Sequence, residues 1–105
     1  MGKAKEHWNR KKDLIRQLIE EGAVDVLPHA FQRIAENSFS LEDLLNSLLA
    51  GSIVDEQKDE KKEAYDLKKY KVFGPGLSGN YVESVGKIVR SEDGKLFVVI
   101  TCYES

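Results

Sequence analysis

The sequence predicts an α+β fold in which N-terminal helices pack on a four-stranded antiparallel sheet. Apolar residues recur at helical spacing as far as residue 50 and then alternate with polar residues to the end of the chain. Helices that precede the strands typically gather on one face of an antiparallel sheet. A chain of 105 residues is expected to form a single domain.

Three helices are expected in the first half of the chain. The first spans residues 4–21 and ends before Gly22, because glycine is a common stop signal. The second spans residues 28–37 and begins with a proline, which a first helical turn tolerates. The third begins after Ser40, which is expected to form a short capping box with Asp43. Its apolar face consists of leucines, and Gly51 follows it: Leu41, Leu44, Leu45, Leu48 and Leu49.

Four strands are expected in the second half, at residues 52–57, 65–74, 80–90 and 95–104. The polar segment "DEQKDEKKEA" is expected to form an exposed hairpin loop between the first two. The last strand is apolar on both sides, which predicts a central position in the sheet. Strict alternation predicts two sets of side chains on its opposite faces: Leu96, Val98, Ile100 and Cys102 on one, and Phe97, Val99, Thr101 and Tyr103 on the other.

Composition and charge exclude several classes of protein. Hydrophobic residues make up 41% of the chain, but no apolar run has the length of a membrane span or the position of a signal peptide. Cys102 has no partner for an internal disulfide, so a reduced, cytoplasmic location is expected, with a secreted or injected toxin that lacks disulfides as the alternative. The net charge of -2 gives no global basic field, so any contact with nucleic acid has to be local. The histidines and the cysteine form no metal motif, and neither a metal nor a cofactor is expected.

His29 and Arg33 form the first candidate pair. They are four residues apart in the helix predicted over residues 28–37, and so lie on one ridge. A histidine can act as a general base, and an adjacent arginine can hold a phosphate group through two hydrogen bonds. The alternative is a solvated polar face, in which Arg33 pairs with Glu36 or Glu42 and His29 binds a loop carbonyl group. Spacing alone favours this alternative.

Thr101 and Tyr103 form the second candidate pair, because they share one face of the last strand. Two hydroxyl groups beside the His/Arg helix could position a phosphate and protonate a leaving oxygen. The alternative is that threonine and tyrosine are ordinary strand formers. Four cations of the strand-rich half are further candidates for binding substrate: Lys69, Lys71, Lys87 and Arg90.

The segment "FGPGLSGNY" contains the pattern G-x-G-x-x-G at Gly74, Gly76 and Gly79, but it does not predict a nucleotide-binding loop. Such loops open a helix, whereas a strand is expected here, and Pro75 disrupts the required geometry. A hairpin connection is expected instead, whose backbone N–H groups could help to bind an anion.

Three short motifs follow one another along the chain: His-Ala-x-x-Arg (His29, Ala30, Arg33), a loop with Gly74, Pro75 and Gly79, and a closing Thr-x-Tyr (Thr101, Tyr103). Together they resemble a small bacterial family of domains of unknown function. That family is grouped with the RelE-type toxins, within the wider barnase–EndoU–colicin–RelE class of metal-independent ribonucleases. The resemblance covers residues 28–104 and implies a RelE-like core, with residues 1–22 as an N-terminal helical extension of the single domain 1–105.

The resemblance also implies a chemistry. Related toxins cleave RNA without a metal, by attack of the 2′-hydroxyl group on its own phosphate. By resemblance, His29 would be the base or the acid, and Arg33 would clamp the phosphate. Tyr103 would be the acid or a positioning group, and Thr101 would donate to the phosphate. RNA and a small antitoxin or immunity protein are the implied partners.

Two other functions stay open. The chain could be a non-catalytic interaction module whose sheet edge or leucine helix binds another protein, or a small-molecule-binding domain that uses the Gly/Pro loop. A nuclease requires His29, Arg33, Thr101 and Tyr103 in one concave, partly exposed patch. An interaction module predicts that they are dispersed or buried, with an exposed apolar patch elsewhere.

Overall fold

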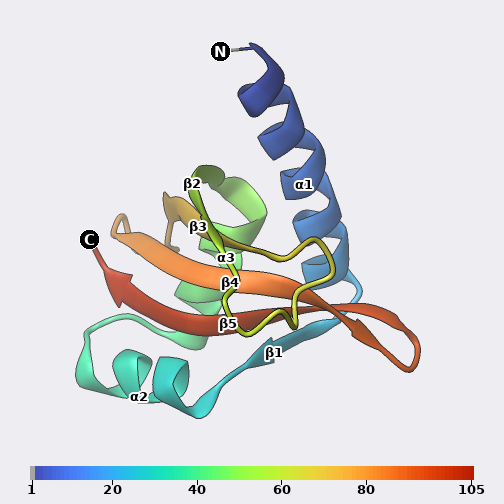
Figure 1. The fold of residues 1–105 in the computed structure, drawn as a ribbon. Coiled ribbons are helices and arrows are strands. Elements are labelled where there is room, and N and C mark those ends of the chain that lie inside the picture. The colour runs from blue at the N-terminus through green and yellow to red at the C-terminus, as the bar shows by residue number, and fades with distance from the viewer. Residues whose placement is uncertain (1) are drawn as a thin grey trace.

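The computed structural model describes residues 2–105, with side chains described from Glu6 onward. Helices and strands follow one another along the chain (Figure 1): α1 (Gly2–Glu20), β1 (Val24–Val26), α2 (Pro28–Glu36), α3 (Leu41–Ala50), β2 (Ser52–Lys58), β3 (Lys68–Pro75), β4 (Tyr81–Ser91) and β5 (Gly94–Glu104). The predicted α+β class is confirmed, and each of the three expected helices is present.

The strands form one mixed sheet in the order β1-β5-β4-β3-β2. The prediction of a four-stranded antiparallel sheet is therefore wrong. The four expected strands do pair antiparallel, but β1 adds a fifth strand that runs parallel to β5, with Val24 opposite Phe97 and Val26 opposite Val99. A strand of three residues is too short to show an alternating pattern, and its pairing with the last strand of the chain leaves no local signal.

A β-bulge in β5 changes the direction of its side chains. The register against β4 shifts by one residue, which leaves Ile100 without a partner. Beyond the bulge Cys102 points into the core, while Thr101 and Tyr103 share the opposite face and are partly exposed. The predicted alternation placed Thr101 and Tyr103 on the face of Phe97, which is fully buried. That prediction is wrong because the extra residue inverts the pattern.

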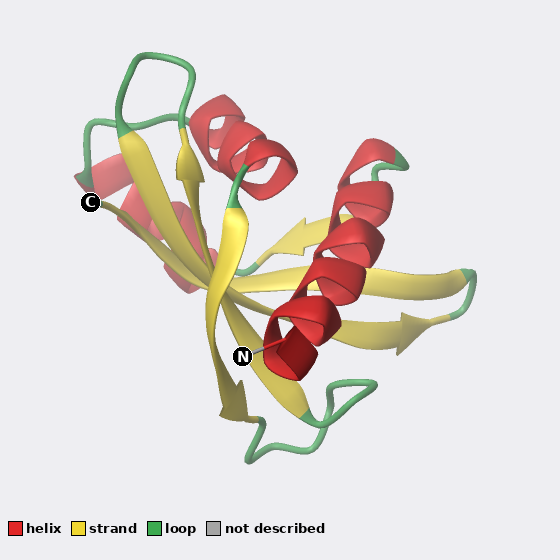
Figure 2. Cartoon of the chain, turned by 90° about the horizontal axis from the view of Figure 1, so that it is seen from above, coloured by secondary structure: helices red, strands yellow, loops and turns green. Residues whose placement is uncertain are grey.

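The core lies between the helices and one face of the sheet. Leu44 and Leu48 of α3 are fully buried in the same apolar cluster as Val72 of β3 and Val82 of β4. Burial of a leucine side chain contributes about 1.5–3 kcal/mol. The leucine face predicted from sequence is therefore the face that packs α3 against the sheet. The loop between β2 and β3 projects on the other side of the sheet, away from α3 (Figure 2).

The start of α3 confirms the predicted capping box. Ser40 Oγ accepts a hydrogen bond from the N–H of Asp43 at 3.1 Å, and Asp43 Oδ2 accepts one from the N–H of Ser40 at 2.9 Å. Asp43 Oδ1 also accepts the N–H of Leu77 at 2.7 Å, which fixes the loop between β3 and β4. The hydrogen bonds from Ser40 and then Leu77 hold the pKa of Asp43 below its ordinary value.

The glycine at the end of α3 is required for close packing. Gly51 follows the helix as predicted, but its φ of -85° is open to any residue. The requirement is space, because a Cβ atom there would lie 2.4 Å from the carbonyl oxygen of Phe73. A Cβ atom on Gly74 would lie 2.4 Å from the carbonyl oxygen of Ser47. The paired glycines let α3 and β3 touch backbone to backbone.

Side chains of α1 attach it to the rest of the domain. Trp8 Nε1 donates a hydrogen bond to Glu56 of β2 at 2.9 Å. Lys12 Nζ and Arg16 Nε donate to the carbonyl oxygen of Leu49, at 3.2 and 3.0 Å. These cations satisfy a free carbonyl group at the C-terminal end of α3, where the helix dipole favours positive charge. The N-terminal helix therefore belongs to the same folded unit.

Candidate functional site

The face of the sheet opposite α3 carries polar and aromatic side chains. Phe73 lies opposite Glu83, which lies opposite Tyr103, so one row of side chains crosses three strands. Directly opposed residues of antiparallel strands point to the same side. We call this surface the open face, and the residues on it that matter below are Lys69, Lys71, Phe73, Tyr81, Glu83, Val85, Lys87, Thr101 and Tyr103.

Residues 59–67, which we call the strap, come just before β3. They run beside the part of β4 that extends beyond the first residues of β3. Ala64 forms a bridge with Val89, and the N–H of Tyr65 donates to the carbonyl oxygen of Ile88 at 2.6 Å. This segment was expected to be an exposed hairpin loop, continuing into a strand from residue 65. Its backbone instead protects an edge of β4 and positions its side chains over the open face.

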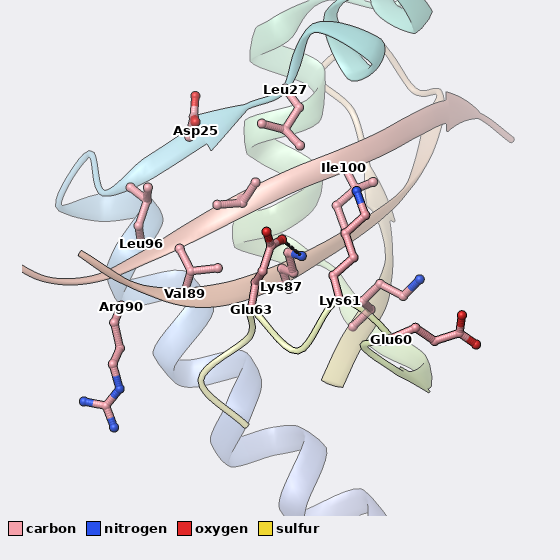
Figure 3. Close-up of a pocket in the computed structure, with 12 residues that line it drawn as sticks. Asp25, Leu27, Glu60, Lys61, Glu63, Lys87, Val89, Arg90, Leu96 and Ile100 are labelled. Carbon is pink, nitrogen blue, oxygen red and sulfur yellow. Dashed lines mark hydrogen bonds and ion pairs between the residues drawn. The ribbon is translucent and has the colours of Figure 1, made fainter. Parts of the chain in front are cut away.

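A buried ion pair holds the strap to the sheet. Lys87 Nζ lies 2.6 Å from a carboxylate oxygen of Glu63 (Figure 3) and 3.5 Å from one of Asp59. The side chains of Lys87 and Asp59 are only 7% and 2% exposed. Burial raises the pKa of Asp59, but hydrogen bonds from the N–H groups of Ala64 and Glu63 and the charge of Lys87 outweigh it and hold that pKa below its ordinary value. The carboxylate is therefore charged at neutral pH.

A cavity of about 890 Å³ opens between the strap and the open face (Figure 3). Its floor is apolar and comes from β4 and β5: Val89, Leu96, Val98 and Ile100. Around this floor stand the cations Lys61, Lys69, Lys87 and Arg90 and the carboxylates Asp25, Glu60 and Glu63. Three of the four cations predicted to bind substrate thus line one cavity. The fourth, Lys71, lies on the open face opposite Val85.

The four residues predicted to be catalytic lie where α2 meets the C-terminal half of β5. The N–H of Leu27, just before α2, donates to the carbonyl oxygen of Val99 at 3.0 Å. His29 and Arg33 are exposed on α2, and Thr101 is half-buried on β5. Among residues 6–105, no hydrogen bond or ion pair joins the helix pair to Thr101 or Tyr103, and none of the four lines the cavity.

Two contacts show how this corner is built. Cys102 Sγ lies 3.5 Å from the carbonyl oxygen of Ala30, so α2 packs on the core side of β5. Burial raises the pKa of the Cys102 thiol to about 11, although the nearby charge of Arg33 opposes the shift. The Tyr103 hydroxyl donates a hydrogen bond to Glu83 on the other side of the strand. The thiol is thus a protonated core group, and β5 separates it from the open face.

Sequence reasoning missed the two carboxylates that attach the strap beside the cavity. Asp59 and Glu63 lie in a charge-rich segment where no single carboxylate stands out. Lys87 offered the one usable signal, because it lies between Val85 and Val89 on the same face of its strand. A lone cation between two apolar neighbours predicts a buried partner. The identity of that partner depends on the path of the strap, which the sequence does not reveal.

The described part of the chain contains no group of three or more His, Cys, Asp or Glu side chains arranged to hold a metal ion. None of its helices combines the length and the apolar character that a membrane span requires.

Comparison with protein families assigns residues 26–104 to the family described as a domain of unknown function, DUF4258. The chain belongs to this family, and the match includes α2, the strap, β3, β4 and β5, while Asp25 of the cavity lining lies just before it. No curated protein and no solved structure matches the chain. The whole of α1 precedes the matched region.

Proposed function

We propose that this DUF4258 domain binds single-stranded RNA across the open face of its sheet and cuts the bound strand, without a metal ion, where α2 meets β5. One observation carries the binding half of this proposal. The cations Lys69, Lys87 and Arg90 line a single cavity, and that cavity opens on the face that also carries the aromatic side chains of Phe73, Tyr81 and Tyr103.

Aromatic side chains on the open face suit unpaired bases. The rings of Phe73 and Tyr81 stack with their centroids 5.2 Å apart and their planes within 3° of parallel. Tyr81 is 49% exposed and Tyr103 is 38% exposed. A base that stacks on such a ring gains about 1–3 kcal/mol, and sheets that bind single-stranded RNA present aromatic side chains in this way.

Charge in the cavity suits the RNA backbone. Two carboxylates already neutralise Lys87, so the cations available for phosphate contacts are Lys61 and Lys69 in the cavity and Arg90 at its edge, where the Arg90 side chain points away from the apolar floor (Figure 3). The apolar floor can take the face of a base while these cations remain at the rim. Because the whole chain is slightly acidic, this attraction is local, and we expect binding to weaken steeply with salt.

The cleaving half rests on the family resemblance. His29 and Arg33 belong to α2, which packs on the core side of β5, whereas Thr101 and Tyr103 lie on the open face, so the RNA has to pass around the edge of β5 to reach all four. In this reaction the 2′-oxygen bonds to its neighbouring phosphorus, and the bond from phosphorus to the 5′-oxygen breaks. His29 takes the proton of the 2′-hydroxyl group, and Tyr103 gives a proton to the departing 5′-oxygen. Arg33 and Thr101 stabilise the charged phosphate oxygens. Tyr103 has to exchange its hydrogen bond to Glu83 for one to the RNA.

The proposal extends to a biological setting. A RelE-like domain that cuts RNA acts in the cytoplasm, where its substrate is, and damages the cell unless it is restrained. We propose that a small antitoxin or immunity protein covers the open face until cleavage is needed. Such a partner would have to present acidic groups to Lys69 and Arg90.

Binding is tested by fluorescence anisotropy with a labelled oligouridylate of about 12 nucleotides, a length within the range of a single-strand site. The double variant Lys69→Gln/Arg90→Gln is expected to bind about tenfold more weakly, with a salt dependence reduced by about two phosphate contacts. Arg10→Gln, which alters an exposed cation of α1, is the matched control and is expected to bind like the wild type. Absence of binding by the wild type at low salt, or equal weakening in both variants, would overturn the RNA proposal in favour of a protein-interaction module.

Cleavage is tested on the same RNA in the presence of a chelator. The wild type is expected to produce fragments ending in a 2′,3′-cyclic phosphate, and His29→Ala/Arg33→Ala is expected to bind the RNA and leave it intact. RNA that the wild type binds without cutting would show that the domain is a binding module and that the catalytic assignment is wrong.

A further inference from the structure

Three cations from three different elements surround one exposed tyrosine beside the cavity. Lys11 of α1, Arg90 of β4 and Lys95 of β5 lie 5.8, 5.0 and 4.4 Å from the centre of the Tyr65 ring. We call these four residues the Tyr65 cluster. Tyr65 is 43% exposed, so the cluster is open to solvent.

The cluster is fixed in place by the backbone. Tyr65 belongs to the strap, and its N–H donates to the carbonyl oxygen of Ile88. Arg90 and Lys95 lie directly opposite each other in the β4–β5 hairpin. The sheet therefore fixes the backbone of Tyr65, Arg90 and Lys95, and only their side chains are free to move.

This arrangement leaves positive charge uncompensated. Like charges directly opposite each other on neighbouring strands are destabilising. Lys11 has a carboxylate partner, since its Nζ lies 3.1 Å from Asp66. In the described part of the chain, neither Arg90 nor Lys95 has a carboxylate within ion-pair distance. Contacts with the ring of Tyr65 offset this repulsion only in part at an exposed site, so a bound anion would stabilise the cluster further.

We propose that the Tyr65 cluster is a phosphate-binding subsite that takes the RNA backbone as the strand leaves the cavity. This inference rests on the proposed RNA binding and adds the path that the bound strand takes, from the cavity to the Tyr65 cluster. Arg90 belongs both to the cavity lining and to the cluster, so it connects the two. An arginine presents paired N–H groups to phosphate oxygens, while a lysine adds a point charge.

The subsite also gives α1 a role in binding. Lys11 lies outside the part of the chain that matches the family, and Arg90 and Lys95 lie within it. The ion pair of Lys11 with Asp66 and the hydrogen bond of Trp8 to Glu56 hold α1 where it completes the cluster. The N-terminal helix thus extends the binding surface of the family domain beyond the cavity.

The test compares a short oligouridylate of about 4 nucleotides with a long one of about 12, because only the long one reaches past the cavity. Lys95→Gln is expected to weaken binding of the long RNA about three- to tenfold and to lower its salt dependence by about one phosphate contact. Binding of the short RNA is expected to stay unchanged. Arg10→Gln serves as the control on α1, and equal thermal unfolding of all three proteins shows that the fold is retained.

The outcomes separate this inference from the proposed function. If the long RNA binds the wild type and Lys95→Gln equally well, the subsite is refuted while RNA binding stands. If the wild type binds neither RNA, the proposed function fails, and titration with inorganic phosphate followed by NMR decides about the subsite alone. Saturable shifts confined to the Tyr65 cluster would then support an anion site, and their absence would refute it.

Discussion

Lys12 is a buried cation whose protonation opposes folding. Its side chain is nearly covered where α1 crosses the end of α3. Burial, and then the charge of Arg16, lower the pKa of Lys12 from 10.5 to about 8. The unfolded chain therefore binds more protons than the folded chain between those two pH values, and the free energy of unfolding contributed by this group rises with pH across that window.

We expect Lys12→Met to remove this pH dependence. Between about pH 7 and about pH 9.5, the wild type should gain on the order of 1 kcal/mol in unfolding free energy relative to the variant. Urea denaturation at both pH values measures the difference. Lys58→Met, which changes an exposed lysine, should follow the wild type. An identical pH response of the wild type and Lys12→Met would show that folding does not lower the pKa of Lys12.

At the residue scale the candidate site was only partly predictable. Spacing placed His29 and Arg33 on one ridge, and they are exposed side by side on α2 as that spacing requires. Their catalytic role stays a prediction. Lys87 was chosen because it is a cation on a strand, but its carboxylate partners Asp59 and Glu63 come from a segment with no regular pattern. Partners brought together by a loop leave no periodic signal in sequence.

At the scale of elements, those that depend on local interactions were predicted from sequence, and those that depend on contacts between distant segments were not. α3 was predicted closely because its capping box and leucine face lie within one short segment. β1 and the bulge in β5 were missed because each depends on pairing between distant strands. The bulge matters most for the site, since it turns Thr101 and Tyr103 onto the open face and leaves Cys102 in the core.

The strap is the element whose attachment most affects the cavity. Replacing Lys87 by methionine leaves the buried carboxylate of Asp59 without its cation, which is expected to lower the unfolding free energy by about 3 kcal/mol. Lys69→Met is the matched control, because Lys69 lines the same cavity and makes no ion pair among residues 6–105. Denaturant unfolding of both variants measures the difference.

The double variant Asp59→Asn/Lys87→Met should recover part of the loss, because asparagine removes the unpaired charge and keeps an oxygen for the backbone N–H groups. Equal unfolding midpoints for Lys87→Met and Lys69→Met would contradict the assignment of the ion pair as the attachment of the strap.

At the scale of the whole molecule, the two faces of the sheet differ in composition and in what covers them. One face packs on α3 and α1 and contains the apolar cluster that stabilises the fold. The other face presents aromatic rings, the cavity and the cations around it, with the strap as one wall. α1 reaches from the first face to the Tyr65 cluster, where Lys11 joins residues of β4 and β5. The residues of the open face that we propose to bind RNA can therefore be varied without disturbing the core.

The most direct measurement is an NMR titration of the labelled protein with an oligouridylate of about 12 nucleotides at low salt. Binding across the open face predicts that amide shifts change in the strap and along β3, β4 and β5, while the solvent side of α3 stays unchanged. Shifts centred on α3, or no shifts at concentrations where the RNA is in excess, would contradict RNA binding by this face.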